Sequence, residues 1–223
     1  MNIVKIFLAV AISVASVISA SAAGEHGLIT LKSGEQIEAP EVWHTGGQAI
    51  YLMGPKQKKV VLEDSEVEYV QFYDEEKKDF GPKMYSEYVI KYTEFNKDEP
   101  KMPKVKKSAL CKLLEKDGCT LYLYIAYSYI IGKEHEYFYF KKPDLPWAIQ
   151  MYPINPLSVN NCNKFWKKMF EDNSTMTKIL NDNSEDFISS YFKNAKAPAI
   201  PFERLTLMYI SLFKDYIETR DKK

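Results

Sequence analysis

The residues of this chain that could bind a metal or move a proton are its histidines and acidic runs. His26, His44 and His135 lie far apart and show no His-x-x-x-His spacing, which two ligands on one helix would need. In the segment 134–136, a strand would send both glutamates to one face and the imidazole to the other. We therefore expect no metal, no cofactor and no catalytic residue. Acidic runs, which usually form solvated faces, occur at 63–64, 74–76 and 98–99.

Nucleophilic catalysis has no local signature either, because the chain contains no Gly-x-Ser-x-Gly motif. Its three cysteines are Cys111, Cys119 and Cys162. An odd number leaves at least one thiol unpaired within an exported monomer. We interpret Cys111 as a half-buried strand residue and Cys162 as a helix core residue, which is the common place of an isolated cysteine. A reactive thiol is the alternative.

The remaining feature that could recognise a ligand is aromatic. Tyrosine and phenylalanine are concentrated between residues 122 and 140. Tyrosine rings on an exposed strand can stack against a sugar or anchor a protein at low entropic cost. The alternative is core packing, since sheets use aromatic residues freely. The candidate residues for binding a protein or a glycan are Tyr122, Tyr124, Tyr137 and Tyr139.

Short β-branched and aromatic runs between Leu28 and Tyr73, separated by turn residues, predict a small antiparallel β module over 23–80. The charged stretch 74–79 is expected to be a solvated connector. Alternation is less clear from Tyr85 to Phe95, and two prolines then interrupt any regular element. A second, α+β region is predicted over 81–223.

Asp117-Gly118 is a turn dipeptide that predicts a hairpin between two apolar strands. A regular ladder from this turn places Cys111 and Cys119 on opposite faces of the sheet. A disulfide between them is then excluded, because the bridge needs Cβ atoms about 3.8 Å apart. Either no bridge forms, or Cys162 pairs with one of the two. The predicted pairs are Lys116 with Cys119, Leu114 with Leu121, Lys112 with Leu123, and Cys111 with Tyr124.

The pattern changes to helical spacing after residue 156. Ser174 and Asn183 are expected to cap two short helices, and Pro201 to open the longest one. The predicted fold class is α+β: the N-terminal antiparallel module, then an antiparallel β-meander over 105–151 packed by helices within 160–220. The predicted apolar helix faces comprise Cys162, Phe165, Trp166, Met169 and Phe170, and later Phe202, Leu205, Met208, Tyr209, Leu212 and Tyr216.

Residues 1–22 have the pattern of a cleavable signal peptide, with Lys5, an apolar run and then Ala20-Ser21-Ala22. No cysteine follows the predicted cleavage point, which argues against a lipid anchor. Removing Lys5 with this segment leaves 29 basic and 30 acidic residues. Such a balance disfavours nucleic acid and anionic membrane surfaces as partners. We expect an exported protein (periplasm, outer envelope or secreted) with no transmembrane segment after cleavage.

The order of motifs resembles that of uncharacterised exported proteins of Bacteroidetes-type bacteria. The resemblance rests on Leu31 to Glu35, the hairpin from Leu113 to Leu123, the strand end Phe140-Lys141-Lys142, and the helices from Lys164 to Leu180. It implies an N-terminal β module, a C-terminal α+β region and a location in the envelope or outside a Gram-negative cell. It brings no catalytic residues.

These observations favour a non-catalytic binding or interaction protein. One alternative is a hydrolase-type enzyme assembled from scattered acids and histidine, which would need a deep polar pocket with one histidine and two acids within hydrogen-bonding reach. The other is a structural envelope component, which would present an exposed apolar patch or a free edge strand.

Overall fold

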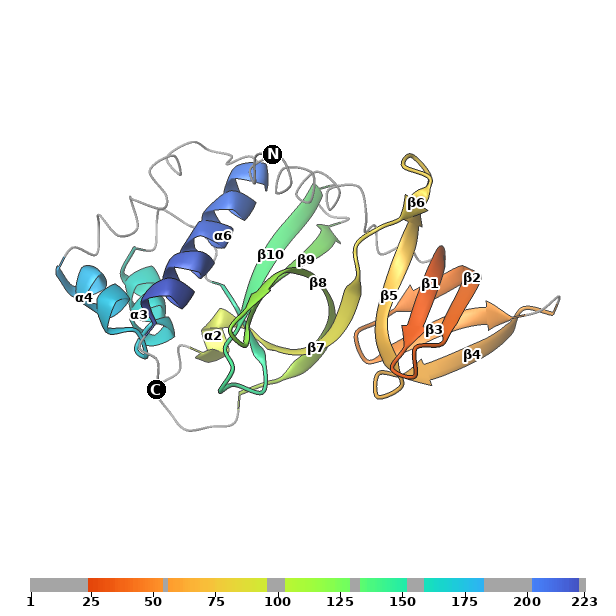
Figure 1. The fold of residues 1–223 in the computed structure, drawn as a ribbon, viewed down its shortest axis with the longest axis horizontal. Coiled ribbons are helices and arrows are strands. Elements are labelled where there is room, and N and C mark those ends of the chain that lie inside the picture. Colours follow the sequence, from red (N-terminus) through yellow and green to blue (C-terminus); the bar gives the residue numbers. More distant parts are fainter. Residues whose placement is uncertain are drawn as a thin grey trace.

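The computed structural model describes residues 24–53, 56–95, 103–128, 133–151, 159–182 and 202–220. The predicted α+β class is confirmed, and Figure 1 shows its arrangement, with helices, a ring of strands and a second group of strands following one another along the long axis. The two groups of strands belong to one sheet of order β11-β10-β9-β8-β7-β5-β1-β2-β3-β4. The signal-peptide segment lies outside the described residues.

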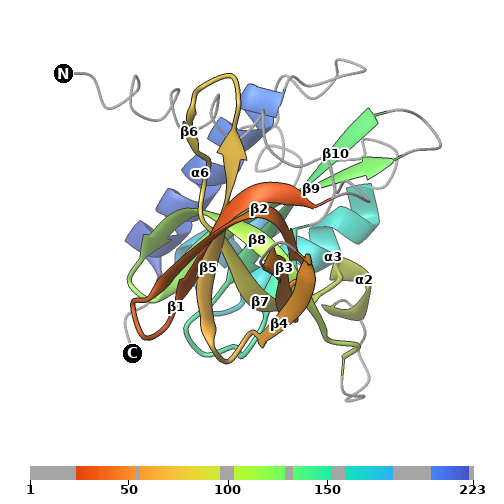
Figure 2. The ribbon, with the colours of Figure 1, turned by 90° about the vertical axis from the view of Figure 1, so that its right-hand side faces the viewer.

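The N-terminal sheet, as we call strands β1 to β5, is antiparallel throughout. Strand β5 pairs with β1, so β4 lies at the free edge. The turn glycines Gly34 and Gly46 have φ of 89° and 84°, a region that glycine enters without steric cost. Figure 2 shows these strands in front of the barrel and helices. Their bounds are β1 (Glu25–Leu31), β2 (Gln36–His44), β3 (Gln48–Met53), β4 (Lys58–Glu63) and β5 (Val67–Asp74), with the short β6 (Asp79–Phe80) paired to β5.

The predicted antiparallel meander is present as strands β8 to β11, and together with β7 it closes into a five-stranded barrel, which the sequence did not predict. Strand β11 pairs in parallel with β7, joining Ala148 to Val89. The sequence predicted no clear strand at β7, because both of its faces mix polar and aromatic side chains. The barrel strands are β7 (Met84–Ile90), β8 (Lys106–Lys116), β9 (Cys119–Ser128), β10 (Lys133–Lys141) and β11 (Ala148–Gln150), with a short helix α2 (Tyr92–Phe95) after β7.

The Asp117-Gly118 turn is confirmed, with φ of 52° and 75°. The pairs Lys116–Cys119 and Leu114–Leu121 are also as predicted, but the register shifts between Lys112 and Leu114. This bulge places Cys111 opposite Leu123 and Lys112 opposite Tyr122, so the predicted pairs of Lys112 and Cys111 are wrong.

The bulge also reverses the expected position of Cys111. Cys111 and Cys119 are both buried on the core face of the sheet, so the prediction that they lie on opposite faces is wrong. They remain free thiols, because the four-residue offset between Cys119 and Leu123 corresponds to about 13 Å along the strand. The side chain of Cys162 lies outside the described residues.

Helix α6 packs on the outside of the barrel at β9 and β10, and α4 packs against α3 and α6 (Figure 1). Phe138 stacks on Tyr209 with ring centroids 4.3 Å apart, and Phe140 meets Phe213 edge-on at 5.3 Å. Trp166 is fully buried, as its helical spacing predicted. The helices are α3 (Val159–Met169), α4 (Ser174–Asp182) and α6 (Phe202–Thr219).

The N-terminus of α4 is capped by Asn173. The sequence predicted Ser174 as the cap, which is wrong by one residue. The Oδ1 atom of Asn173 accepts a hydrogen bond from the Met176 N–H at 2.9 Å, and its Nδ2 donates to the Tyr216 carbonyl at 3.0 Å. One side chain therefore satisfies an orphan N–H of α4 and ties this helix to α6. The helix predicted after Asn183 lies outside the described residues.

Candidate functional site

The four candidate tyrosines lie on one face of the sheet. Tyr122 is paired with Tyr139, and Tyr124 with Tyr137, on neighbouring strands. The intervening residues of β9 and β10 point to the helices that cover the outside of the barrel. Because side chains alternate along a strand, the tyrosines point into the barrel.

Depth divides these tyrosines into two pairs. Tyr122 and Tyr139 are 5% and 7% exposed and pack with apolar side chains in the barrel interior. Tyr124 and Tyr137 are half-buried, with ring centroids 6.3 Å apart. The four rings therefore do not form one exposed surface: Tyr122 and Tyr139 are buried, as in the core-packing alternative, and Tyr124 and Tyr137 are the half-buried members of the set.

Glu87, a half-buried acid that the sequence did not single out, contacts the tyrosine cluster at Tyr122. The Tyr122 hydroxyl donates to Oε2 of Glu87 at 3.0 Å, and Lys141 contacts the same oxygen at 2.7 Å. Burial, followed by the charge of Glu87, raises the pKa of Tyr122. Burial raises the pKa of Tyr139 to about 12. Both hydroxyls are therefore protonated hydrogen-bond donors at neutral pH and cannot act as bases.

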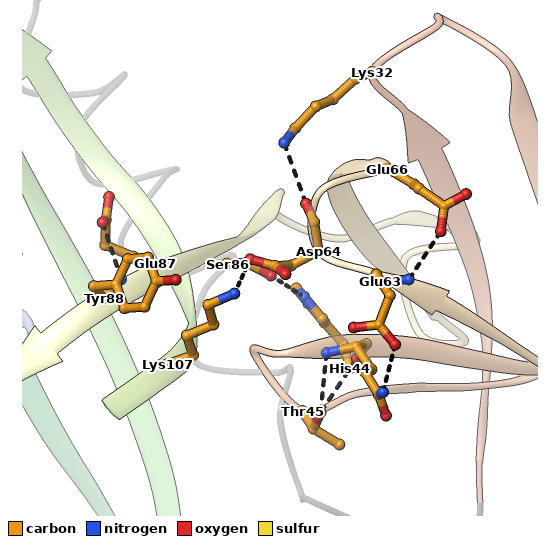
Figure 3. A network of polar contacts seen from close by, with 11 residues as sticks. Lys32, His44, Thr45, Glu63, Asp64, Glu66, Ser86, Glu87, Tyr88 and Lys107 are labelled. Carbon is orange, nitrogen blue, oxygen red and sulfur yellow. Dashed lines mark hydrogen bonds and ion pairs between the residues drawn. The ribbon is translucent and has the colours of Figure 1, made fainter. Parts of the chain in front are cut away.

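Three contacts fasten the N-terminal sheet to the barrel, and we call them the module junction. His44 Nε2 lies 3.0 Å from the Ser86 hydroxyl of β7. Gly46 lies so close to β8 that an added Cβ would be 2.5 Å from the backbone of Ser108. Lys107 of β8 forms an ion pair with Asp64, in the turn after β4 (Figure 3).

The His44–Ser86 contact has the geometry of a nucleophile and its base, but the chemistry of His44 argues against that role. Burial lowers the pKa of His44 to about 4, so the ring is neutral at pH 7 and a weak proton acceptor. Its Nδ1 atom is buried without a hydrogen-bond partner in the described part of the chain. No acid therefore orients the imidazole as catalytic triads require.

A second polar cluster joins the C-terminal end of α6 to the barrel. Asp172 accepts hydrogen bonds from Lys142, at 2.6 Å, and from the Tyr216 hydroxyl. Arg220 donates to the Cys119 sulfur at 3.2 Å. Burial raises the pKa of the Cys119 thiol, although Arg220 opposes the shift. A fully buried, protonated thiol indicates a structural contact rather than a nucleophile.

The remaining histidines do not assemble a site among the described residues. His26 pairs with Glu38 at 2.8 Å on the surface, and the side chain of His135 lies outside the description. No group of three metal-ligating side chains forms within the described ranges. One open surface depression of about 460 Å³ contains acids but no histidine, and its lining residues are Glu171, Ser174, Thr177, Lys178, Asn181 and Asp182.

No protein-family model, curated protein or solved structure matches this chain. Within the described ranges, no helix has both the length and the apolar character needed to span a membrane.

Proposed function

We propose that this protein is an exported, non-catalytic binding or interaction protein of the cell envelope or the secreted fraction, with a glycan or a protein as its ligand. Export rests on the signal-peptide pattern of residues 1–22 and on the resemblance to exported proteins of Bacteroidetes-type bacteria. No cofactor is part of this proposal.

The observation that carries the binding proposal is the half-buried ring pair Tyr124 and Tyr137, 6.3 Å apart. The buried rings of Tyr122 and Tyr139 lie next to this pair on the same strands. The supporting rings restrict the pair before a ligand arrives, which reduces the entropy lost on binding. Aromatic faces with polar hydroxyl tips suit a sugar ring or a protein side chain.

Replacing both rings, Tyr124→Ala with Tyr137→Ala, should weaken binding about tenfold or more, since each aromatic contact contributes about 0.5–1.5 kcal/mol. Binding is measured on an array of neutral and acidic oligosaccharides and by titration calorimetry with the best hit. Protein ligands are sought by affinity capture from the native envelope with both forms.

The matched control is Tyr88→Ala, because Tyr88 is 47% exposed on the barrel's outer side. This variant should bind as the unmodified protein does. If the double variant binds as tightly as the unmodified protein, the proposed site is wrong. Loss of binding by the control alone would move the site to the outer face.

The His44–Ser86 contact at 3.0 Å favours a second candidate function, a serine hydrolase. We expect no labelling of Ser86 by a fluorophosphonate probe, because His44 is a weak base without an orienting acid. Labelling that disappears in Ser86→Ala and in His44→Gln would favour the hydrolase over the binding protein.

A further inference from the structure

Strand β4 is a free edge whose outward main-chain groups can be assigned. Asp64 N–H donates to the Gly47 carbonyl at 3.2 Å, so Asp64 and the alternate residues before it direct their main-chain groups to β3. Lys59, Val61 and Glu63 therefore direct theirs away from the sheet. Among the described strands, β4 pairs only with β3.

The turn after β4 covers one end of this edge. The Glu66 carboxylate accepts the Glu63 N–H at 3.1 Å (Figure 3), and the Glu66 N–H donates to the Glu63 carbonyl at 2.9 Å. Among the described residues, no such hydrogen bond covers Val61, further along the edge, and its side chain is 43% exposed. The centre of the edge is therefore open to another strand.

The side chains beside this opening form an apolar row that crosses three strands. The last member of the row, Val61, lies between two charged residues of β4. Val61 is opposite Ile50, and Ile50 is opposite Trp43, so the three lie on one face of β4, β3 and β2. Lys59 and Glu63 flank Val61 on the same face, because side chains alternate with period two. Both flanking residues are exposed.

We propose that two copies of this chain associate through antiparallel pairing of their β4 strands, centred on Val61. With Val61 opposite Val61, each Lys59 faces Glu63 of the other copy, which forms two ion pairs. The two apolar rows then join into one row across the combined sheet. A shift of the register by two residues loses both ion pairs, so charge complementarity selects this register.

Edge lysines usually prevent strand pairing, but here each lysine finds an acid on the second copy. The contact is small, and Glu66 ends the ladder at Glu63, so main-chain hydrogen bonds form only around Val61. We expect a weak dimer, with a dissociation constant on the order of 100 µM, as small interfaces give.

Dimerisation of the chain without residues 1–22 is measured by sedimentation equilibrium. It should depend on protein concentration between about 10 µM and 1 mM, a range that spans the expected dissociation constant. Lys59→Glu and Glu63→Lys should each be monomeric, because each places like charges opposite one another. A mixture of these two variants should form heterodimers, because every opposite pair is then complementary. The doubly exchanged chain should dimerise again.

The control is Lys116→Glu, which changes an exposed charge at the end of β8 and should leave dimerisation unchanged. Circular dichroism establishes that each variant is folded. A chain that stays monomeric over the whole concentration range would overturn the proposal. The same holds for a monomeric chain whose β4 edge pairs with a strand of another protein. A dimer that persists in both single variants, or a mixture that stays monomeric, would do so too.

Discussion

At the scale of single residues, His44 combines burial, neutrality and a position between two parts of the sheet. Its Nε2 contacts Ser86, and its buried Nδ1 has no hydrogen-bond partner in the described part of the chain. Burial is the cause of its low pKa, about 4. A protonated ring would place a charge in the module junction without a counter-charge in contact, which a low-dielectric site opposes.

This position predicts a pH dependence of stability. The folded-state pKa of His44 lies below the unfolded value of about 6.5, so its contribution is complete above that pH and is lost as pH falls towards 4. The free energy of unfolding should drop by up to about 3 kcal/mol across this interval. Urea denaturation of the protein and of His44→Gln at pH 7, 5.5 and 4 measures this difference.

Surface His26 supplies the comparison, because its side chain is 37% exposed and pairs with Glu38. The variant His26→Gln should keep the pH dependence, whereas His44→Gln should lose it. If both variants retain the same slope, another group causes the acid instability.

At the scale of elements, the bulge in β8 decides which side chains enter the core. The turn set the register of Lys116 and Leu114 as expected, and the extra residue Leu113 then moved Cys111 to the core face and Lys112 into line with Tyr122. Two adjacent leucines in an otherwise alternating strand were the available signal, since a bulge places two residues opposite one.

Deleting Leu113 should remove the bulge and leave a regular ladder in which Lys112 stays opposite Tyr122 and Cys111 stays opposite Leu123. The variant Leu113→Ala keeps the bulge and should cost about 1–2 kcal/mol in the free energy of unfolding for a half-buried leucine. The deletion should cost about 3 kcal/mol or more, because it also removes the bend that the bulge gives β8. Chemical denaturation measures both variants, and equal costs would show that this bend adds no stability.

At the scale of the whole molecule, the two groups of strands act as one sheet. Strand β5 pairs with β1 along its length and with β7 through Val70 and Met84. The module junction adds a close approach of Gly46 to Ser108. The domain boundary predicted near residue 80 therefore lies within a continuous sheet, between the paired strands β5 and β7.

Two glycines measure how much this approach matters. Gly46→Ala should cost about 3 kcal/mol or more, from positive φ and a Cβ in contact with the β8 backbone. Gly34 has a similar φ with nothing within 4 Å of an added Cβ, so Gly34→Ala should cost only about 1 kcal/mol. Thermal or urea denaturation gives both values, and equal costs would show that the junction is loosely packed.

Local pattern determined most of the elements of this protein. Alternation and turn residues predicted the N-terminal strands and the hairpin at Asp117-Gly118, and helical spacing predicted α3 and α6, because hydrophobic period and turn conformation depend on neighbouring residues. Alternation along a strand also puts Tyr122 and Tyr124 on one face, whereas the pairing with Tyr137 and Tyr139 comes from the register of β9 and β10.

Tertiary structure alone decided what those elements enclose. Closure of the barrel by β11 and β7, the depth of Tyr122 beside Glu87, and the burial of His44 against Ser86 all join residues distant in sequence. No local period encodes such contacts, because they depend on how whole strands curve and meet. The sequence thus identified the aromatic residues, and the closed barrel determined that Tyr122 and Tyr139 are buried while Tyr124 and Tyr137 are half-buried.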